Sequence, residues 1–246
     1  MNIKVIMSCD DNPYYLDFWH LVSYVWKEKM GLHPVLVHVG EADATEEYGE
    51  VHKIKVDEEI PIHTQAQMSR MWYTHKEPDT RWVTSDIDMI PTSKEFWNKF
   101  TTDCHSYDWI NLNSVDNYFP ICYNIALGET FKNVLDIDED FHEYVIKSIK
   151  SVDEDLKHTP ENWNGEEMSK WNVDEVYSSR KISDFRDSGG KVFQPPVPIN
   201  KWGRRIDRSY WGYDEKLLKQ GFYIDCHSLR PLSLHKEEID KMVGMI

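Results

Sequence analysis

The sequence predicts an α/β fold in which a largely parallel sheet is flanked by helices. Short runs rich in β-branched and aliphatic residues alternate with longer stretches in which apolar residues recur at helical spacing. Residues that favour turns separate the two kinds of segment. The chain has 246 residues, of which 40% are hydrophobic, and it contains no internal repeat or low-complexity linker, so we expect a single domain with a substantial core.

The first forty residues have the pattern of a β-α-β unit. Residues 3–7 form a short β-branched run, and Asn12 and Pro13 are typical of the cap and the first residue of a helix. Apolar residues then recur at helical spacing as far as Gly31, which is typical of a helix end. The apolar run at 34–39 predicts a second, buried strand.

The rest of the chain continues this alternation. Residues 136–162 are highly charged and carry helical patches, so we expect a charged insertion or surface lobe there. The other expected elements are a helix at 63–76 and strands at 51–56, 81–85, 108–113 and 120–126.

The composition excludes several classes of protein. The 28 Lys and Arg residues against 43 Asp and Glu give a formal net charge of −15, which disfavours a surface that follows nucleic-acid phosphates or anionic lipid. No apolar run approaches the ~20 residues that cross a bilayer, and the first residues do not resemble a secretory signal. The 4 cysteines show no CxxC spacing. We therefore expect a reduced, cytoplasmic chain with no nucleic-acid partner and no integral membrane segment.

A pair of aspartates directly follows the strand expected at 81–85. Side chains at the spacing of Asp86 and Asp88 point to the same side of a strand, and at a strand end two such carboxylates can hold a hard divalent cation. Without a cation, their desolvation and mutual repulsion would be costly. Three further D-x-D triplets lie in charged, helix-like sequence, where a solvated surface is the default, at 136–138, 138–140 and 153–155.

The residues around this pair resemble a known enzyme group. Residues 67–73, which include Arg70, and the segment at 82–91 are similar to the nucleotide-sugar glycosyltransferases of the GT-A fold. In that group a helix carries an Arg before a strand that ends in a DxD motif. The resemblance implies a Rossmann-like mixed sheet, a Mn²⁺ or Mg²⁺ ion on the motif, and a nucleotide-sugar donor, with UDP-sugar favoured by analogy alone. It also implies a nucleotide-sugar-binding half at about 1–115, followed at about 116–246 by an acceptor half and a C-terminal metal- or phosphate-binding segment.

An acidic segment at 171–177 extends the resemblance. It is similar to the segment that such enzymes place beside the reacting sugar, which implies a catalytic role for Asp174 or Glu175. In an inverting enzyme either carboxylate would be the general base for the acceptor hydroxyl. In a retaining enzyme it would instead stabilise the oxocarbenium-like centre or orient the acceptor. The helix dipole alone also favours acidic residues at a helix start.

A second patch, at 222–231, is similar to the late strand-to-loop segment where a His completes the metal shell and a nearby cation meets phosphate. This implies His227 as the third metal ligand and Arg230 as a phosphate-binding residue. The spacing from His227 to Arg230 is shorter than the usual spacing of the family to a Lys-Pro pair. His235 and Asp225 are therefore alternatives for the metal ligand.

Two further groups of residues are expected near the donor. Ser8, Cys9 and Asp10 close the first strand, where an open α/β sheet usually receives a nucleotide. Arg70 would add a planar, permanently charged donor to the phosphates or to a nearby carboxylate. In addition, the Arg- and Trp-rich segment at 201–212 suits a mobile lid, in which Arg204 and Arg205 would contribute to donor binding; the alternative is a surface loop that pairs with acidic residues.

The sequence therefore predicts a metal-dependent glycosyltransferase that moves a sugar from a nucleoside-diphosphate donor to the hydroxyl of a glycan or other acceptor. A sugar-1-phosphate nucleotidylyltransferase is the nearest alternative enzyme, but residues 8–13 lack the glycines and cations expected of a loop that cradles a triphosphate. A catalytically inactive module that binds a nucleotide or carbohydrate is the alternative from another class.

Overall fold

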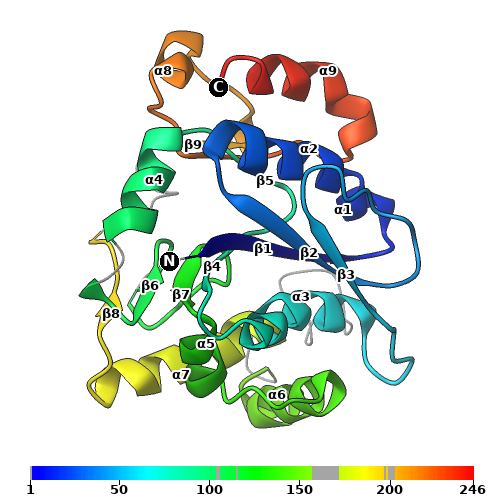
Figure 1. The fold of residues 1–246 in the computed structure, drawn as a ribbon, viewed down its shortest axis with the longest axis vertical. Coiled ribbons are helices and arrows are strands. Elements are labelled where there is room, and N and C mark those ends of the chain that lie inside the picture. Colours follow the sequence, from blue (N-terminus) through cyan, green and yellow to red (C-terminus); the bar gives the residue numbers. More distant parts are fainter. Residues whose placement is uncertain (1, 104–105, 115, 157–171, 197, 199–202) are drawn as a thin grey trace.

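A seven-stranded sheet runs through the centre of the computed structural model, with helices on both of its faces (Figure 1). The structure describes residues 2–103, 106–114, 116–156, 172–196, 198 and 203–246. The strands lie in the order β3-β2-β1-β4-β7-β6-β8. Their bounds are β1 (Ile3–Asp10), β2 (His33–Val39), β3 (Glu50–Ile54), β4 (Arg81–Thr84), β6 (Trp109–Asn111), β7 (Asn124–Leu127) and β8 (Val192–Phe193).

The sheet is mixed and largely parallel, as the sequence predicts. β1 pairs in parallel with both β2 and β4, β2 with β3, and β6 with β8. β7 is the exception, because it is antiparallel to its neighbours β4 and β6. The carboxyl ends of β1 and β4 therefore meet at the same edge of the sheet, next to each other.

The first β-α-β unit forms where it was expected, with a longer strand and a divided helix. β1 continues to Asp10, beyond the expected end at residue 7. Asn12 caps the helix by accepting a hydrogen bond from the Tyr14 N–H at 3.0 Å, and Gly31 ends it with a φ of 78°. The helical stretch comprises α1 (Pro13–Leu16), α2 (Phe18–Tyr24) and a π-helix, η1 (Val25–Met30).

Alternate residues of β1 serve two hydrophobic clusters, one on each face of the sheet. Val5 and Met7 belong to the cluster beneath α2 and η1, whereas Ile6 belongs to the cluster beneath α3. None of the helices in the described part of the chain is long and apolar enough to cross a membrane. The other helices are α3 (Ile62–Tyr73) with the 3₁₀ turn η2 (Thr74–Lys76), α4 (Lys94–Asp103), α5 (Gly128–Val134), α6 (Phe141–Leu156), α7 (Val173–Asp187), η6 (Arg208–Tyr210), α8 (Glu215–Lys219) and α9 (Leu232–Val243).

The charged region at 136–162 is only partly a surface lobe. Its helix α6 packs against α3 and α7, below the sheet in Figure 1, and buries Tyr144, Val145 and Val152 in the second cluster. The charges of this insertion occupy one face of an amphipathic helix, and its other face completes the core. The end of the predicted region, 157–162, lies outside the described residues.

A second, three-stranded sheet joins the C-terminal part of the chain to the segment after β4. Its order is β5 (Met89–Pro91), β10 (Asp225–His227) and β9 (Arg205–Asp207). β10 is antiparallel to β5, and His227 lies opposite Met89. The Ser228 N–H also donates a hydrogen bond to the Asp88 carbonyl at 3.0 Å. This sheet, which the sequence does not predict, brings the late segment at 222–231 beside the aspartate pair.

Candidate functional site

A cavity of about 430 Å³ opens beyond the carboxyl ends of β1 and β4. Segments from the start, middle and end of the chain form its walls. The structure brings together there ten of the residues that the sequence assigns to metal, donor and catalysis, which are Ser8, Cys9, Asp10, Arg70, Asp86, Asp88, Asp174, Glu175, His227 and Arg230. The roles of these residues remain predictions, but their convergence in one cavity is a property of the fold.

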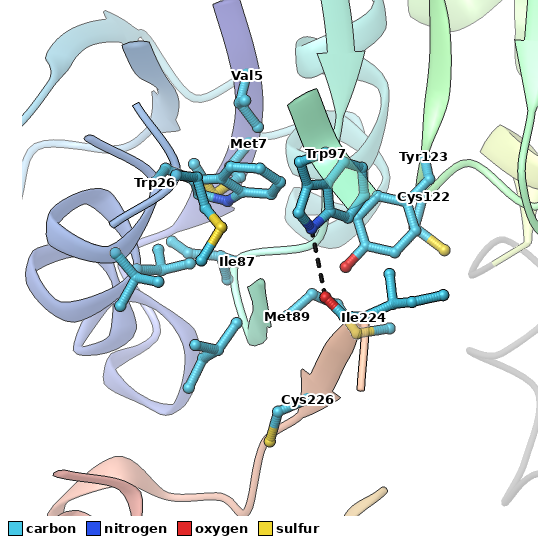
Figure 2. Close-up of a cluster of buried hydrophobic side chains, with 14 of the residues drawn as sticks. Val5, Met7, Trp26, Ile87, Met89, Trp97, Cys122, Tyr123, Ile224 and Cys226 are labelled. Carbon is cyan, nitrogen blue, oxygen red and sulfur yellow. Dashed lines mark hydrogen bonds between the residues drawn. The ribbon is translucent and has the colours of Figure 1, made fainter. Parts of the chain in front are cut away.

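The two aspartates lie in a turn rather than on a strand. β4 ends at Thr84, and the Met89 N–H donates to the Asp86 carbonyl at 3.1 Å across the turn. Ile87, which is 3% exposed, packs into the cluster that contains Met89 and Trp97 (Figure 2). The same cluster is tied to the residue that precedes β10 by the Trp97 Nε1–H, which donates to the Ile224 carbonyl at 3.3 Å (Figure 2). The buried Ile87 thus anchors the turn that carries both carboxylates.

One oxygen of Asp88, Oδ2, faces three basic side chains. Arg208 Nη1 lies 2.7 Å away, Arg230 Nε 3.5 Å and His227 Nε2 3.6 Å. Burial opposes ionisation of Asp88, but the interactions with His227, Arg230 and Arg208 outweigh it and lower the pKa of Asp88 to about 2. Asp88 is therefore ionised at neutral pH, as a metal ligand has to be.

Asp86 is paired with Arg70 of α3. The Arg70 Nη1–H donates to Asp86 Oδ1 and to the Ser85 carbonyl, the latter at 2.8 Å. The Arg70 Nε and the Gln67 Oε1, one turn earlier on α3, are buried and have no hydrogen-bond partner within the described residues. Both residues also line the cavity.

Asp174 and Glu175 open helix α7, as the sequence predicts. Asp174 is buried, and its Oδ1 accepts a hydrogen bond from the Glu175 N–H at 2.8 Å. Burial and the charge of Glu175 raise the pKa of Asp174, and the nearby guanidinium of Arg70 only partly offsets them. Burial also raises the pKa of Glu175, against the hydrogen bond that the Tyr118 hydroxyl donates to it. The pair therefore holds a proton more tightly than two solvated carboxylates would.

The end of β1 forms a further wall. Asp10 Oδ1 accepts a hydrogen bond from the Asn12 N–H at 3.1 Å, so Asp10 helps to shape the turn into α1 as well as lining the cavity. Burial raises the pKa of the Cys9 thiol, and the negative charge of Asp10 raises it further. This thiol therefore stays protonated at neutral pH. Tyr15 faces the cavity, and its ring centroid lies 5.0 Å from the Arg230 guanidinium.

The lid prediction for Arg204 and Arg205 was wrong, because neither side chain lines the cavity. Arg205 is buried, and its Nε donates to Asp225 at 3.0 Å, which joins β9 to β10. Arg204 donates to the Phe222 carbonyl at 2.8 Å. Of the arginines in this segment, it is Arg208 that reaches the cavity. Residues 201–202 of the predicted lid lie outside the described part of the chain.

The alternatives for the metal ligand are placed elsewhere. Asp225 is held in its buried ion pair with Arg205. His235, on α9, lies 3.2 Å from Glu238 and does not line the cavity. His227, by contrast, faces Asp88. Asp136 and Asp138, from the other D-x-D triplets, pair with Lys147 away from the cavity, as expected of surface residues.

Asp86, Asp88 and His227 have the chemistry of a site for Mn²⁺ or Mg²⁺, since they offer two hard carboxylates and an imidazole. The 3.6 Å between Asp88 Oδ2 and His227 Nε2 suits two ligands of one ion, because ligands at about 2.1 Å from an ion lie about 3 Å or more apart. As the side chains stand, no group of three or more His, Cys, Asp or Glu in the described ranges is arranged to hold a metal. Asp86 faces Arg70 instead.

Sequence reasoning did not assign Tyr15, Gln67, Tyr118 or Arg208 to the site. Gln67 and Arg208 lie inside segments that the sequence does single out, at 67–73 and 201–212, so a weak signal for them exists. Nothing local distinguishes Tyr118 from the other tyrosines of the chain. Its position follows from the contact between the segment before β7 and the start of α7.

Solved structures of the galactosyltransferase LgtC share this fold. The galactosyltransferase LgtC, in complex with donor and acceptor sugar analogues, superposes with a TM-score of 0.52 at 12% sequence identity, over 100% of this chain and 96% of LgtC. An active-site mutant of LgtC gives a TM-score of 0.51 at 12% identity, over 99% of this chain and 95% of the other. A glycosyltransferase involved in glycosylation of the major capsid of PBCV-1 gives a TM-score of 0.46 at 11% identity, over 98% of this chain and 100% of the other.

The likeness to LgtC establishes that the chain has the GT-A fold of these glycosyltransferases. No protein-family model and no curated protein matches the sequence.

Proposed function

We propose that this protein is a metal-dependent glycosyltransferase, which moves a sugar from a nucleoside-diphosphate donor, with UDP-sugar favoured, to the hydroxyl of a glycan or other acceptor. One observation carries the proposal. A single cavity at the carboxyl edge of the sheet is lined both by Asp88 with its basic neighbours and by the acidic pair Asp174 and Glu175. The GT-A fold, which LgtC shares, supports the same reading.

Transfer of a sugar from a diphosphate needs positive charge at the leaving group. Arg230 and Arg70 supply permanently charged guanidinium groups at the cavity, and Gln67 adds a buried amide. Asp86, Asp88 and His227 would hold Mn²⁺ or Mg²⁺. When bound, such an ion supplies Lewis-acid stabilisation of the negative charge that develops on the departing phosphate.

The sugar needs negative charge on its other side, because the anomeric carbon becomes oxocarbenium-like as its bond to phosphate breaks. Asp174 and Glu175 supply it. Burial raises the pKa of both carboxyls, and because Asp174 is the more deeply buried of the two, we place the retained proton on Asp174 and the negative charge on Glu175. Glu175 is the less buried of the two, and it can both stabilise the developing charge and accept a proton from the acceptor hydroxyl.

Calorimetric titration of UDP and GDP, each with and without Mn²⁺, tests the donor site. We expect one of the two nucleotides to bind in the presence of Mn²⁺ and the Asp88→Asn variant to lose that binding. Asp138→Asn is the matched control, because Asp138 belongs to a D-x-D triplet whose carboxylate pairs with Lys147 outside the cavity. Binding that ignores both the metal and Asp88 would contradict the proposal.

Turnover then separates an enzyme from an inactive binding module. The wild-type protein should release UDP or GDP from a panel of nucleotide-sugars, and Glu175→Gln should lower the rate while the nucleotide still binds. A protein that binds the nucleotide but turns over no sugar in that panel would be a binding module.

A further inference from the structure

If Asp88 ligates a metal, its carboxylate interacts both with that metal and with the basic side chains around it. In the structure Asp88 Oδ2 lies 2.7 Å from Arg208 Nη1. Arg230 and His227 lie farther from the same oxygen, at 3.5 and 3.6 Å. The Asp88 side chain is only 7% exposed, so its charge needs a partner at all times. A divalent cation on this carboxylate must therefore compete with the guanidinium that lies closest to it.

Of the three basic side chains, Arg208 is the least constrained. Arg230 stacks over the rings of Tyr14 and Tyr15, with centroid distances of 5.3 and 5.0 Å. His227 is part of β10, and its Nδ1 lies 3.4 Å from Asp207. Arg208 begins the short 3₁₀ turn η6, and its side chain is 28% exposed. In the part of the chain that is described, no ion pair or hydrogen bond other than that with Asp88 holds its guanidinium.

We propose that Arg208 is a movable counter-ion, which neutralises Asp88 in the free protein and transfers to the diphosphate of the donor when a divalent cation takes its place on Asp88. This inference rests on the proposed function. The exchange leaves the buried carboxylate neutralised in both states, first by the guanidinium and then by the metal. It also delivers a planar, permanently charged donor to the phosphate oxygens, where guanidinium groups bind well.

The exchange couples the two ligands. In the free protein Arg208 weakens metal binding, because its guanidinium is bound to the Asp88 carboxylate. The same ion pair weakens nucleotide binding, because Arg208 has to leave Asp88 before it can bind phosphate. Once metal and nucleotide are both bound, each favours the state that the other needs, so their binding is cooperative. Removal of Arg208 should therefore change the two affinities in opposite directions, which loss of a merely structural ion pair would not do.

Calorimetry on Arg208→Gln tests this prediction. We expect Mn²⁺ alone to bind about threefold to tenfold more tightly than to wild type, because a competing cation is gone. We expect UDP or GDP, whichever wild type binds, to bind at least about tenfold more weakly in saturating Mn²⁺, because a charge-assisted hydrogen bond is lost. Arg208→Lys keeps the charge without the planar fork, and should keep the metal affinity of wild type while still weakening the nucleotide.

Arg204→Gln is the matched control, since Arg204 lies in the same segment but bonds to the Phe222 carbonyl outside the cavity. Both of its affinities should equal those of wild type. Unchanged affinities in Arg208→Gln, or a loss of both, would overturn the inference while leaving the proposed function intact. If Arg208→Gln fails to fold, Arg208→Lys decides, and unaltered nucleotide binding by it would overturn the inference. Failure of wild type itself to bind either nucleotide would instead refute the proposed function, and the inference with it.

Discussion

Arg70 Nη2 lies 3.9 Å from Asp174 Oδ2, while Nη1 of the same guanidinium bonds to Asp86. Arg70 thus joins the turn after β4, which carries Asp86, to the start of α7, which carries Asp174. Because Arg70 is 4% exposed and Asp174 is 2% exposed, little solvent is available to screen the guanidinium or to stabilise a charge on Asp174. The stability of the fold and the arrangement of the site therefore depend on the same contact.

We expect Arg70→Met to lower the free energy of unfolding by about 3–5 kcal/mol, the usual cost of removing one partner of a buried ion pair. Urea denaturation measures this. The double variant Arg70→Met/Asp86→Asn should recover part of the loss, because it also removes the carboxylate that Arg70 neutralises. Purely additive effects of the two substitutions would show that Arg70 and Asp86 do not interact.

Asp174→Asn should stabilise the protein at alkaline pH. The raised pKa of Asp174 means that the folded state retains a proton which the unfolded chain releases above about pH 4. The free energy of unfolding of wild type therefore falls as the pH rises from about 4 towards the folded-state pKa, and Asn escapes this loss. A tenfold difference in proton affinity corresponds to about 1.4 kcal/mol, and each kcal/mol shifts Tm by about 2–4 °C in a domain of this length.

We therefore expect the Tm of Asp174→Asn, relative to wild type, to rise by at least about 3 °C between pH 5 and pH 9. Asp136→Asn is the control, because the pKa of Asp136 is lowered, chiefly by its hydrogen bond to Lys147. That substitution should bring no gain at alkaline pH. A Tm difference for Asp174→Asn that is independent of pH would contradict the assignment of the proton.

His227→Ala should weaken Mn²⁺ binding by at least about tenfold, as loss of a ligand does. Mg²⁺ should be affected less, because it depends more on oxygen ligands than Mn²⁺ does. Titration of each metal in the absence of nucleotide measures both effects. His235→Ala, on α9 outside the cavity, should bind both metals like wild type. Equal losses in the two His variants would argue against His227 as a ligand.

Ile87 links core packing to the site. Ile87→Ala should lower the free energy of unfolding by about 2–5 kcal/mol, and Ile87→Val by about 0.5–1.5 kcal/mol. Because Ile87 anchors the turn between the two aspartates, Ile87→Ala should also weaken Mn²⁺ binding. Ile110→Ala is the control, since Ile110 belongs to the same cluster but does not line the cavity. A similar loss of metal affinity in Ile110→Ala would show that the effect of Ile87→Ala comes from lower global stability and not from the position of the turn.

Local sequence was sufficient for the longer strands of the central sheet, but it did not predict β8. The strands at β1, β2 and β4 and the helix at α3 lie within a few residues of their predicted positions, because each forms an apolar run or a helical repeat of its own. The short strands β5 and β9 were not predicted, and β10 was implied only by the resemblance of residues 222–231 to a strand-to-loop segment. A strand of three residues is too short to show a periodic pattern in the sequence. These strands form because the three segments pair with one another.

The candidate metal ligands show the same division between what local sequence predicts and what tertiary structure sets. Asp86 and Asp88 could be selected from four D-x-D triplets because only this pair follows an apolar strand. His227 could not be separated from His235 or Asp225 by local pattern. The antiparallel register of β10 and β5 places His227 opposite Met89, and of these three residues it is His227 that faces Asp88. The burial of Arg205 against Asp225, and the approach of Arg208 to Asp88 instead, likewise depend on β9 pairing with β10.

The sequence by itself determined the α/β class, the succession of the main strands along the chain, and the polar residues at the ends of β1 and β4. These are consequences of backbone geometry within a few residues, which sets the periods of two and 3.6 that a chain displays along its length. Tertiary structure alone decided which cations neutralise which carboxylates, namely Arg70 for Asp86 and Arg208 for Asp88. Those pairs join segments far apart in the chain, and their partners are set by how helices and strands pack, which no local spacing records.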